Sequence, residues 1–170
     1  MTIEKQSYTI RRMSWSSLPP ITVEIECAAT TLEGVKLGLA VSVAVGRKES
    51  LIGASLSGAN LNMANLNGAS LNMASLNGAS LYGETIIRCF ARVPRDDGYT
   101  LLAMQLEAGG VKIAAGCRWF TVAEFRAHVA SSYPGEPKAV ETLWILSSIE
   151  QRAADLGIAL EPAATIEEPA

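Results

Sequence analysis

The sequence has little of what metal centres, disulfide frameworks and acid–base catalysis need. Its 170 residues include one histidine, His128, and three cysteines, Cys27, Cys89 and Cys117. The cysteines are odd in number, far apart and never in a C-x-x-C spacing, so they indicate reduced thiols rather than disulfides or a zinc site. We therefore expect no metal and no cofactor.

Charge is also sparse, at 18% of residues, with a net charge of −3. Nucleic-acid binders carry a basic surface, so direct binding to nucleic acid is not expected. The first ten residues, MTIEKQSYTI, lack the apolar core of a secretory signal. The longest apolar run, residues 37–45, is too short to span a bilayer. These absences predict a cytoplasmic location and no membrane partner.

No arrangement of catalytic residues can be recognised. A Ser-His-Asp site would have to use His128, but no G-x-S-x-G nucleophile motif accompanies it. The stretch VGRKES at 45–50 lacks the spacing of a phosphate-binding loop. The glycines of AGGVKIAAG at 108–116 lack dinucleotide-binding spacing and are better explained by a hairpin. The sequence thus predicts a protein that is not an enzyme.

The dominant feature that is present is a repeat of five residues. An Ala precedes each repeat centre by two positions from Ala54 to Ala79, and no charged residue occurs between 51 and 83. The repeat centres are Leu51, Leu56, Leu61, Leu66, Leu71, Leu76, Leu81 and Ile86. A period of five fits neither the 3.6-residue helix nor the two-residue strand alternation. The chain is therefore predicted to turn a corner in every repeat, with Leu and Ala inside.

These residues resemble the pentapeptide-repeat family, and the layout around them is loosely similar to phage and prophage members. The resemblance is specific over residues 54–82. It implies a mainly β fold: a short right-handed, quadrilateral β-helix in which four pentapeptides make one coil. The chain would form about two coils, with the Leu and Ile centres as the β-helix core and residues twenty apart stacked.

The flanking segments are predicted to cap this β-helix. Residues 1–48 form an N-terminal cap with a strand at 21–27 and a helix at 32–45, which Thr31 would cap. The repeat occupies residues 49–88. Residues 89–160 form a C-terminal cap of strands, a β-hairpin and two helices, and residues 161–170 form a disordered acidic tail.

Within the C-terminal cap the local signals are stronger. Strands are predicted at 85–93, 99–106 and 111–115, the last two joined as a hairpin. Thr121 and Glu124 form a capping box, which starts a helix at Val122. Pro137 occupies the first turn of a longer helix.

The long helix carries more apolar residues than one face needs. Its predicted buried stripe consists of Val140, Leu143, Leu146, Ile149, Ala153 and Leu156. Trp144 and Ile145 lie off this stripe. Two interpretations stay open for the pair: a contact between copies in an oligomer, or deeper burial in the same chain.

A second candidate site surrounds Arg118 and Trp119. A guanidinium beside an indole can bind a planar anion by ion pairing and stacking. The candidate ligand-binding residues are Arg88, Arg92, Arg118, Trp119, Arg126 and His128. The alternative is that Trp119 and Phe120 pack the hairpin onto the following helix while Arg118 is solvated.

Three functional hypotheses follow. The first is a non-enzymatic scaffold or interaction protein that acts through protein–protein contacts as a homo-oligomer, with an unidentified protein partner. The second is a protein that binds or sequesters a small anionic ligand, such as a nucleotide signal, in phage counter-defence. The third, implied by the resemblance alone, is inhibition or protection of DNA gyrase by mimicry of DNA. Mimicry needs ordered negative charge, which residues 51–83 lack.

Overall fold

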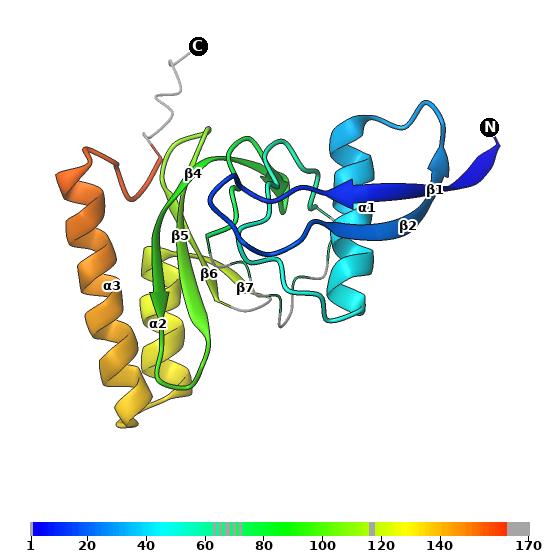
Figure 1. Cartoon of the computed structure of the whole chain (residues 1–170). Helices are drawn as coiled ribbons and strands as arrows, with labels where there is room; N and C mark the ends of the chain where they lie inside the picture. The colour runs from blue at the N-terminus through cyan, green and yellow to red at the C-terminus, as the bar shows by residue number, and fades with distance from the viewer. Residues whose placement is uncertain are drawn as a thin grey trace, which may run out of the picture. The chain divides into compact units, whose positions relative to one another are not determined.

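The computed structural model describes residues 2–62, 64, 66, 69, 71, 73–115 and 118–162. Among these residues the fold is mainly β, with sheets, turns and three helices (Figure 1). The contacts divide the chain into two compact units. Of the described residues, unit 1 contains those up to Cys89 together with Arg118, and unit 2 contains Phe90–Ala115 and those from Trp119 onward. The boundary therefore falls inside strand β4 (Glu84–Pro94).

Unit 1 begins with a two-stranded antiparallel sheet of β1 (Ile3–Ile10) and β2 (Ile21–Ala28). Residues of β2 alternate between buried and exposed, because side chains of a strand point to opposite faces. Helix α1 (Glu33–Gly46) packs on both strands. The strand predicted at 21–27 is confirmed and extends one residue further.

The predicted boundaries of α1 are wrong at both ends. Its N-cap is Leu32 rather than Thr31, and no side chain accepts a hydrogen bond from the first turn. The helix includes Gly46, and the chain leaves it through Lys48, which has a φ of +59°. The N–H of Glu49 donates to the carbonyl of Ala44 (2.9 Å), which satisfies one free carbonyl of the last turn.

The repeat turns every five residues, as predicted. In each turn the N–H of an Ala donates to the carbonyl of the Leu three residues before it, at 3.0–3.1 Å. The six pairs are Ala54–Leu51, Ala59–Leu56, Ala64–Leu61, Ala69–Leu66, Ala74–Leu71 and Ala79–Leu76. Parallel bridges join Ser55 to Ser75 and Asn60 to Ser80. Both bridges span twenty residues, so the chain returns alongside itself after four pentapeptides.

The repeat centres lie inside this arrangement. Seven of them are at most 9% exposed, namely Leu51, Leu56, Leu61, Leu71, Leu76, Leu81 and Ile86. Leu66 is only half-buried. Ala54, Ala59, Ala74 and Ala79 are at most 1% exposed. A larger side chain at these Ala positions would have to displace its neighbours, because protein interiors are close-packed.

Strand β3 (Ser80–Leu81) ends the repeat and pairs with the start of β4, where Leu81 lies opposite Glu84. In unit 2 the sheet continues in the order β4, β5 (Thr100–Leu106), β6 (Val111–Ala115) and β7 (Arg118–Thr121). The β5–β6 hairpin is antiparallel, with Gln105 opposite Val111, as the sequence predicted. Strand β7 was not predicted, because Arg118 and Trp119 were interpreted as a candidate binding patch, and Thr121 was interpreted as the cap of the following helix.

Two helices complete unit 2: α2 (Val122–Ser132) and α3 (Pro137–Asp155). Helix α2 packs against α3 and β6 (Figure 1). The core they share with the sheet includes Leu101 and Ile113 from the strands and Phe125 and Leu146 from the helices. Pro137 stands in the first turn of α3, as predicted.

The buried face of α3 matches the predicted stripe at Leu146, Ile149 and Ala153 and departs from it at Val140. The buried residues are Ala139, Thr142, Ile145, Leu146, Ile149 and Ala153. Val140, placed in the stripe by the sequence, is 69% exposed. The apolar pattern missed Thr142, whose hydroxyl donates to the carbonyl of Lys138 (2.7 Å) and so is satisfied inside the core.

Candidate functional site

The α3 outer face exposes two large apolar side chains of unit 2, Val140 and Trp144. We define it as Val140, Trp144, Ser147, Ser148, Gln151 and Asp155, which are exposed and follow one another at intervals of one to four residues. Such intervals place side chains on one side of a helix. Val140 and Trp144 are both 69% exposed.

A shallow hollow of about 440 Å³ lies beside Trp144, and its lining is Trp144, Ser147, Ser148, Gln151, Arg152 and Asp155. The two serines in this lining have short side chains. The hydroxyls of Ser147 and Ser148 donate to the carbonyls of Leu143 and Trp144, both at 3.1 Å, so they fold back onto the helix. Gln151 Nε2 donates to Asp155 Oδ1 (2.9 Å) along the same helix. The outer face therefore presents a large indole next to two serines whose hydroxyls are hydrogen-bonded to their own helix.

The helix backbone at Trp144 is anchored in the core of unit 2 by the next two residues. Ile145 and Leu146 follow Trp144 directly and are at most 1% exposed in the core of unit 2. Of the two residues predicted as an oligomer contact, Trp144 is thus at the surface and Ile145 belongs to the core. Ile145 is therefore not available to another chain while unit 2 stays folded.

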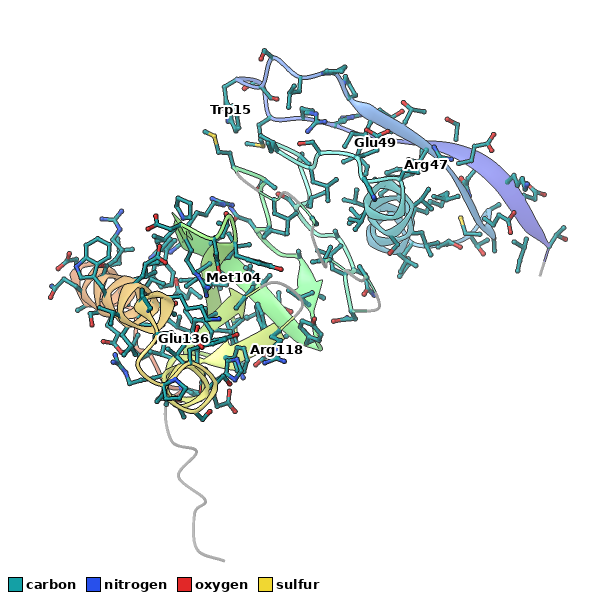
Figure 2. The ribbon with its side chains drawn as sticks, turned by 90° about the horizontal axis from the view of Figure 1, so that it is seen from below. Trp15, Arg47, Glu49, Met104, Arg118 and Glu136 are labelled. Carbon is teal, nitrogen blue, oxygen red and sulfur yellow. The ribbon has the colours of Figure 1, made fainter. Side chains whose placement is uncertain are left out.

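The residues predicted to bind an anion fall in both units. Arg88 and Arg118 belong to unit 1, and Arg92, Trp119, Arg126 and His128 belong to unit 2. Arg118 is exposed at the start of β7, where Figure 2 labels it, and Trp119 is half-buried.

His128 is part of an aromatic cluster in unit 2. Its ring stacks on that of Phe120 at a centroid distance of 5.2 Å and meets the Tyr133 ring edge-on at 5.9 Å. Its Nδ1 lies 3.0 Å from Ser132 Oγ, within hydrogen-bond distance. Phe120 also stacks on Phe125. Phe120 therefore packs β7 onto α2, which is the packing alternative raised from the sequence.

Arg126 has a partner on the neighbouring helix. Its Nη2 lies 2.7 Å from Glu150 Oε1, so this ion pair joins α2 to α3. An anion bound by Arg126 would have to compete with Glu150. Arg95, at the β4–β5 turn, forms an ion pair with Asp97.

The residues that fix α1 to the repeat were not predicted from the sequence. The carbonyl of Gly34 accepts a hydrogen bond from Asn60 N–H (2.8 Å). A Cβ on Gly38 would lie 1.9 Å from the Asn60 carbonyl oxygen, and one on Gly34 would lie 2.5 Å from that of Gly58. Only glycine permits so close an approach of the two backbones. The signal in the sequence is the spacing G-x-x-x-G, which puts both glycines on one helix face.

Arg12 holds the first turns of the repeat. Its two terminal nitrogens donate to the carbonyls of Ser50 (2.9 Å) and Ile52. Its Nε donates to the carbonyl of Pro19 (2.7 Å). Trp15, in the loop after β1, lies near Gly53, where an added Cβ would meet the indole at 3.0 Å (Figure 2). These contacts attach the N-terminal segment to the start of the repeat.

One titratable contact joins β1 to α1. Tyr8 Oη donates to Glu33 Oε1 (2.6 Å). Partial burial, and then the hydrogen bond to Glu33 and its negative charge, raise the pKa of Tyr8 to about 12. The hydrogen bond between Tyr8 and Glu33 therefore links β1 to the first turn of α1.

Within the described ranges, no three His, Cys, Asp or Glu side chains gather as a metal site would require. Nor does any helix of the described chain have the length and apolar character to cross a membrane. Cys117, next to the Arg118 patch, lies outside the described residues.

Comparison with known proteins agrees with the backbone geometry. Residues 50–83 match the family model of pentapeptide repeats in 8 copies. The chain is thus a protein with pentapeptide repeats, as the resemblance predicted, and the match covers 34 of its 170 residues. No curated protein and no solved structure matches the chain.

Proposed function

We propose that this protein is a non-enzymatic interaction scaffold that binds a protein partner through the α3 outer face. The observation that carries the proposal is Trp144, 69% exposed beside a shallow hollow on a helix whose opposite face is buried. Trp is enriched among the few residues that dominate protein–protein binding, because it supplies a large contact area at little entropic cost.

In this proposal the repeat is a rigid support. It forms a right-handed, four-sided β-helix of about two coils, with residues 1–48 as its N-terminal cap. The five-residue turns and the twenty-residue parallel pairing support the four-sided coil. Its outward side chains are uncharged between residues 51 and 83, so we assign the binding energy to unit 2 rather than to the repeat.

Affinity purification from the native host tests the scaffold function. Tagged wild-type protein and Trp144→Ala are compared by quantitative mass spectrometry, and each enriched protein is then purified and bound again. We expect at least one partner whose binding to wild type is lost with Trp144→Ala. Leu32→Ala is the matched control, because Leu32 is 76% exposed but lies in unit 1. The same proteins on wild type and Trp144→Ala, bound equally well, would contradict the proposal.

A second candidate function is the binding of a small anionic ligand, such as a nucleotide signal. The exposed Arg118 beside the half-buried Trp119 favours it. Native mass spectrometry of freshly purified protein tests it directly. Nucleotide that co-purifies with the wild-type protein but not with Arg118→Ala would support this function. Ligand-free wild-type protein that also shows no heat of nucleotide binding in calorimetry would contradict it.

Inhibition or protection of DNA gyrase stays a hypothesis, and so does a phage origin of the chain. The gyrase hypothesis rests on the resemblance alone, and an uncharged repeat offers no ordered negative charge to imitate phosphates. A supercoiling assay with no effect at large protein excess would eliminate it.

A further inference from the structure

We infer that the partner of the α3 outer face is a second copy of this chain, paired with the first through α3 in an antiparallel, two-fold arrangement. This inference rests on the proposed function, because it names the occupant of the same surface. Two features of α3 support it independently: the shape of the outer face and the positions of its flanking charges.

The outer face is complementary to itself in shape. The large residues Val140 and Trp144 occupy its N-terminal half, and the short residues Ser147 and Ser148 follow in its C-terminal half. A two-fold axis beside residues 146 and 147 sets Trp144 of each copy over the serines of the other. Each indole then fills the hollow of the opposite copy, and both hollows are filled at once.

The flanking charges select the antiparallel orientation. Glu141 and Arg152 are eleven residues apart, which is close to three helical turns, so they lie on the same flank of α3. An antiparallel pair brings Glu141 of each copy to Arg152 of the other, twice. A parallel two-fold pair would instead place this flank of the two copies on opposite sides of the contact, so that Glu141 would not meet Arg152.

Both charged groups are accessible for this contact. Arg152 is exposed near the C-terminal end of α3. Glu141 is half-buried and accepts a hydrogen bond from Asp96 N–H (2.8 Å) through Oε1, which leaves Oε2 for a second donor. The Asp96 contact also holds the carboxylate in place before a second copy arrives.

The size of the face sets the expected strength. Helix α3 has 19 residues and is therefore roughly 28 Å long. With a diameter of about 10–12 Å, one such helix from each copy supplies an interface below the standard range of about 1,200–2,000 Å², as in weak and transient complexes. We therefore expect a reversible dimer whose population depends on protein concentration.

Analytical ultracentrifugation of the full chain over a concentration series tests the inference. We expect a monomer–dimer equilibrium, and Trp144→Ala should raise the dimer dissociation constant about tenfold or more. Leu32→Ala should leave that constant unchanged. Circular dichroism and melting temperature establish that each variant is folded, which we expect because both side chains are exposed.

Charge reversal separates this arrangement from any other dimer. Arg152→Glu and Glu141→Arg should each weaken the dimer severalfold, and the double variant should regain most of the wild-type affinity. A monomer at every concentration, or a dimer indifferent to all three changes, would overturn the inference. A monomer that still binds another protein through Trp144 would leave the scaffold function standing, so the two failures can be told apart.

Discussion

At the scale of single residues, Gly38 is the clearest example of a small residue with a large structural role. Alanine normally favours a helix over glycine by about 1 kcal/mol. A Cβ at Gly38, however, would lie 1.9 Å from a backbone oxygen of Asn60, which cannot turn away as a flexible side chain could. The cost of separating α1 from the repeat should therefore exceed the gain in helix propensity.

We expect Gly38→Ala to lower the free energy of unfolding of unit 1 by about 1–3 kcal/mol, the usual cost of overpacking. Gly46→Ala is the matched control, because an added Cβ there meets nothing within 4 Å and the helix should become slightly more stable. Urea denaturation followed by circular dichroism measures both. Equal stabilisation by the two variants would show that α1 does not pack on the repeat as described.

At the scale of elements, the start of α2 depends on one ionised side chain. Glu124 N–H donates to Thr121 Oγ1 (3.1 Å), and Thr121 N–H donates to Glu124 Oε2 (2.7 Å). The backbone hydrogen bond from Thr121, followed by its side-chain hydrogen bond and the charge of Lys112, lowers the pKa of Glu124 below its usual value, against a small opposing effect of burial. The capping box thus stabilises the helix most when Glu124 is ionised.

The sign of the pH dependence follows from that lowered pKa. The stabilisation is complete above the pKa of an unfolded glutamate, near 4.5, and is lost as pH falls through the lower folded value. We expect Glu124→Gln to remove this part of the acid dependence, while Thr121→Ala costs about 1 kcal/mol at neutral pH. Urea denaturation at several pH values checks both. An unchanged acid profile in Glu124→Gln would mean that the carboxylate is not the titrating group.

The α3 helix illustrates what an apolar pattern can and cannot say about an element. The pattern located the helix and its start at Pro137. It assigned Val140 to the buried face, but Val140 is exposed and the nearby residues Thr142 and Ile145 are buried in the core instead. A surplus of apolar residues on a helix shows that two faces avoid water, but only packing decides which of them the same chain covers.

At the scale of the whole molecule, the described chain contains two units, each with buried apolar residues of its own. Leu61 is fully buried in the repeat of unit 1, and Ile149 is 1% exposed in the core of unit 2. Structures of this kind open in separate cooperative regions, so one free energy of unfolding does not describe the whole chain.

We expect Leu61→Ala and Ile149→Ala each to destabilise by about 2–5 kcal/mol the unit that contains the change. Hydrogen exchange with peptide-level mass spectrometry distinguishes the units. Exchange should accelerate in α1 and β2 for the first variant, and in α2, α3 and β5 for the second. Uniform acceleration across the chain in both variants would show instead that the units unfold together.

The sequence by itself determined the features that depend on neighbours along the chain. The five-residue turns follow from the spacing of Leu and Ala, the β5–β6 hairpin from its glycines, and the start of α2 from Thr121 and Glu124. These patterns bring together groups that are close in the chain, so the covalent order is enough to predict them.

Only the tertiary structure decided which surfaces are covered and which stay open. It placed Gly38 against the backbone of the repeat, left Leu66 half-buried, put Ile145 in the core and left Trp144 at the surface. Each outcome depends on contact between segments far apart in the sequence. The hydrophobic effect is non-directional, so the sequence predicts that an apolar residue favours burial but not which segment of the chain buries it.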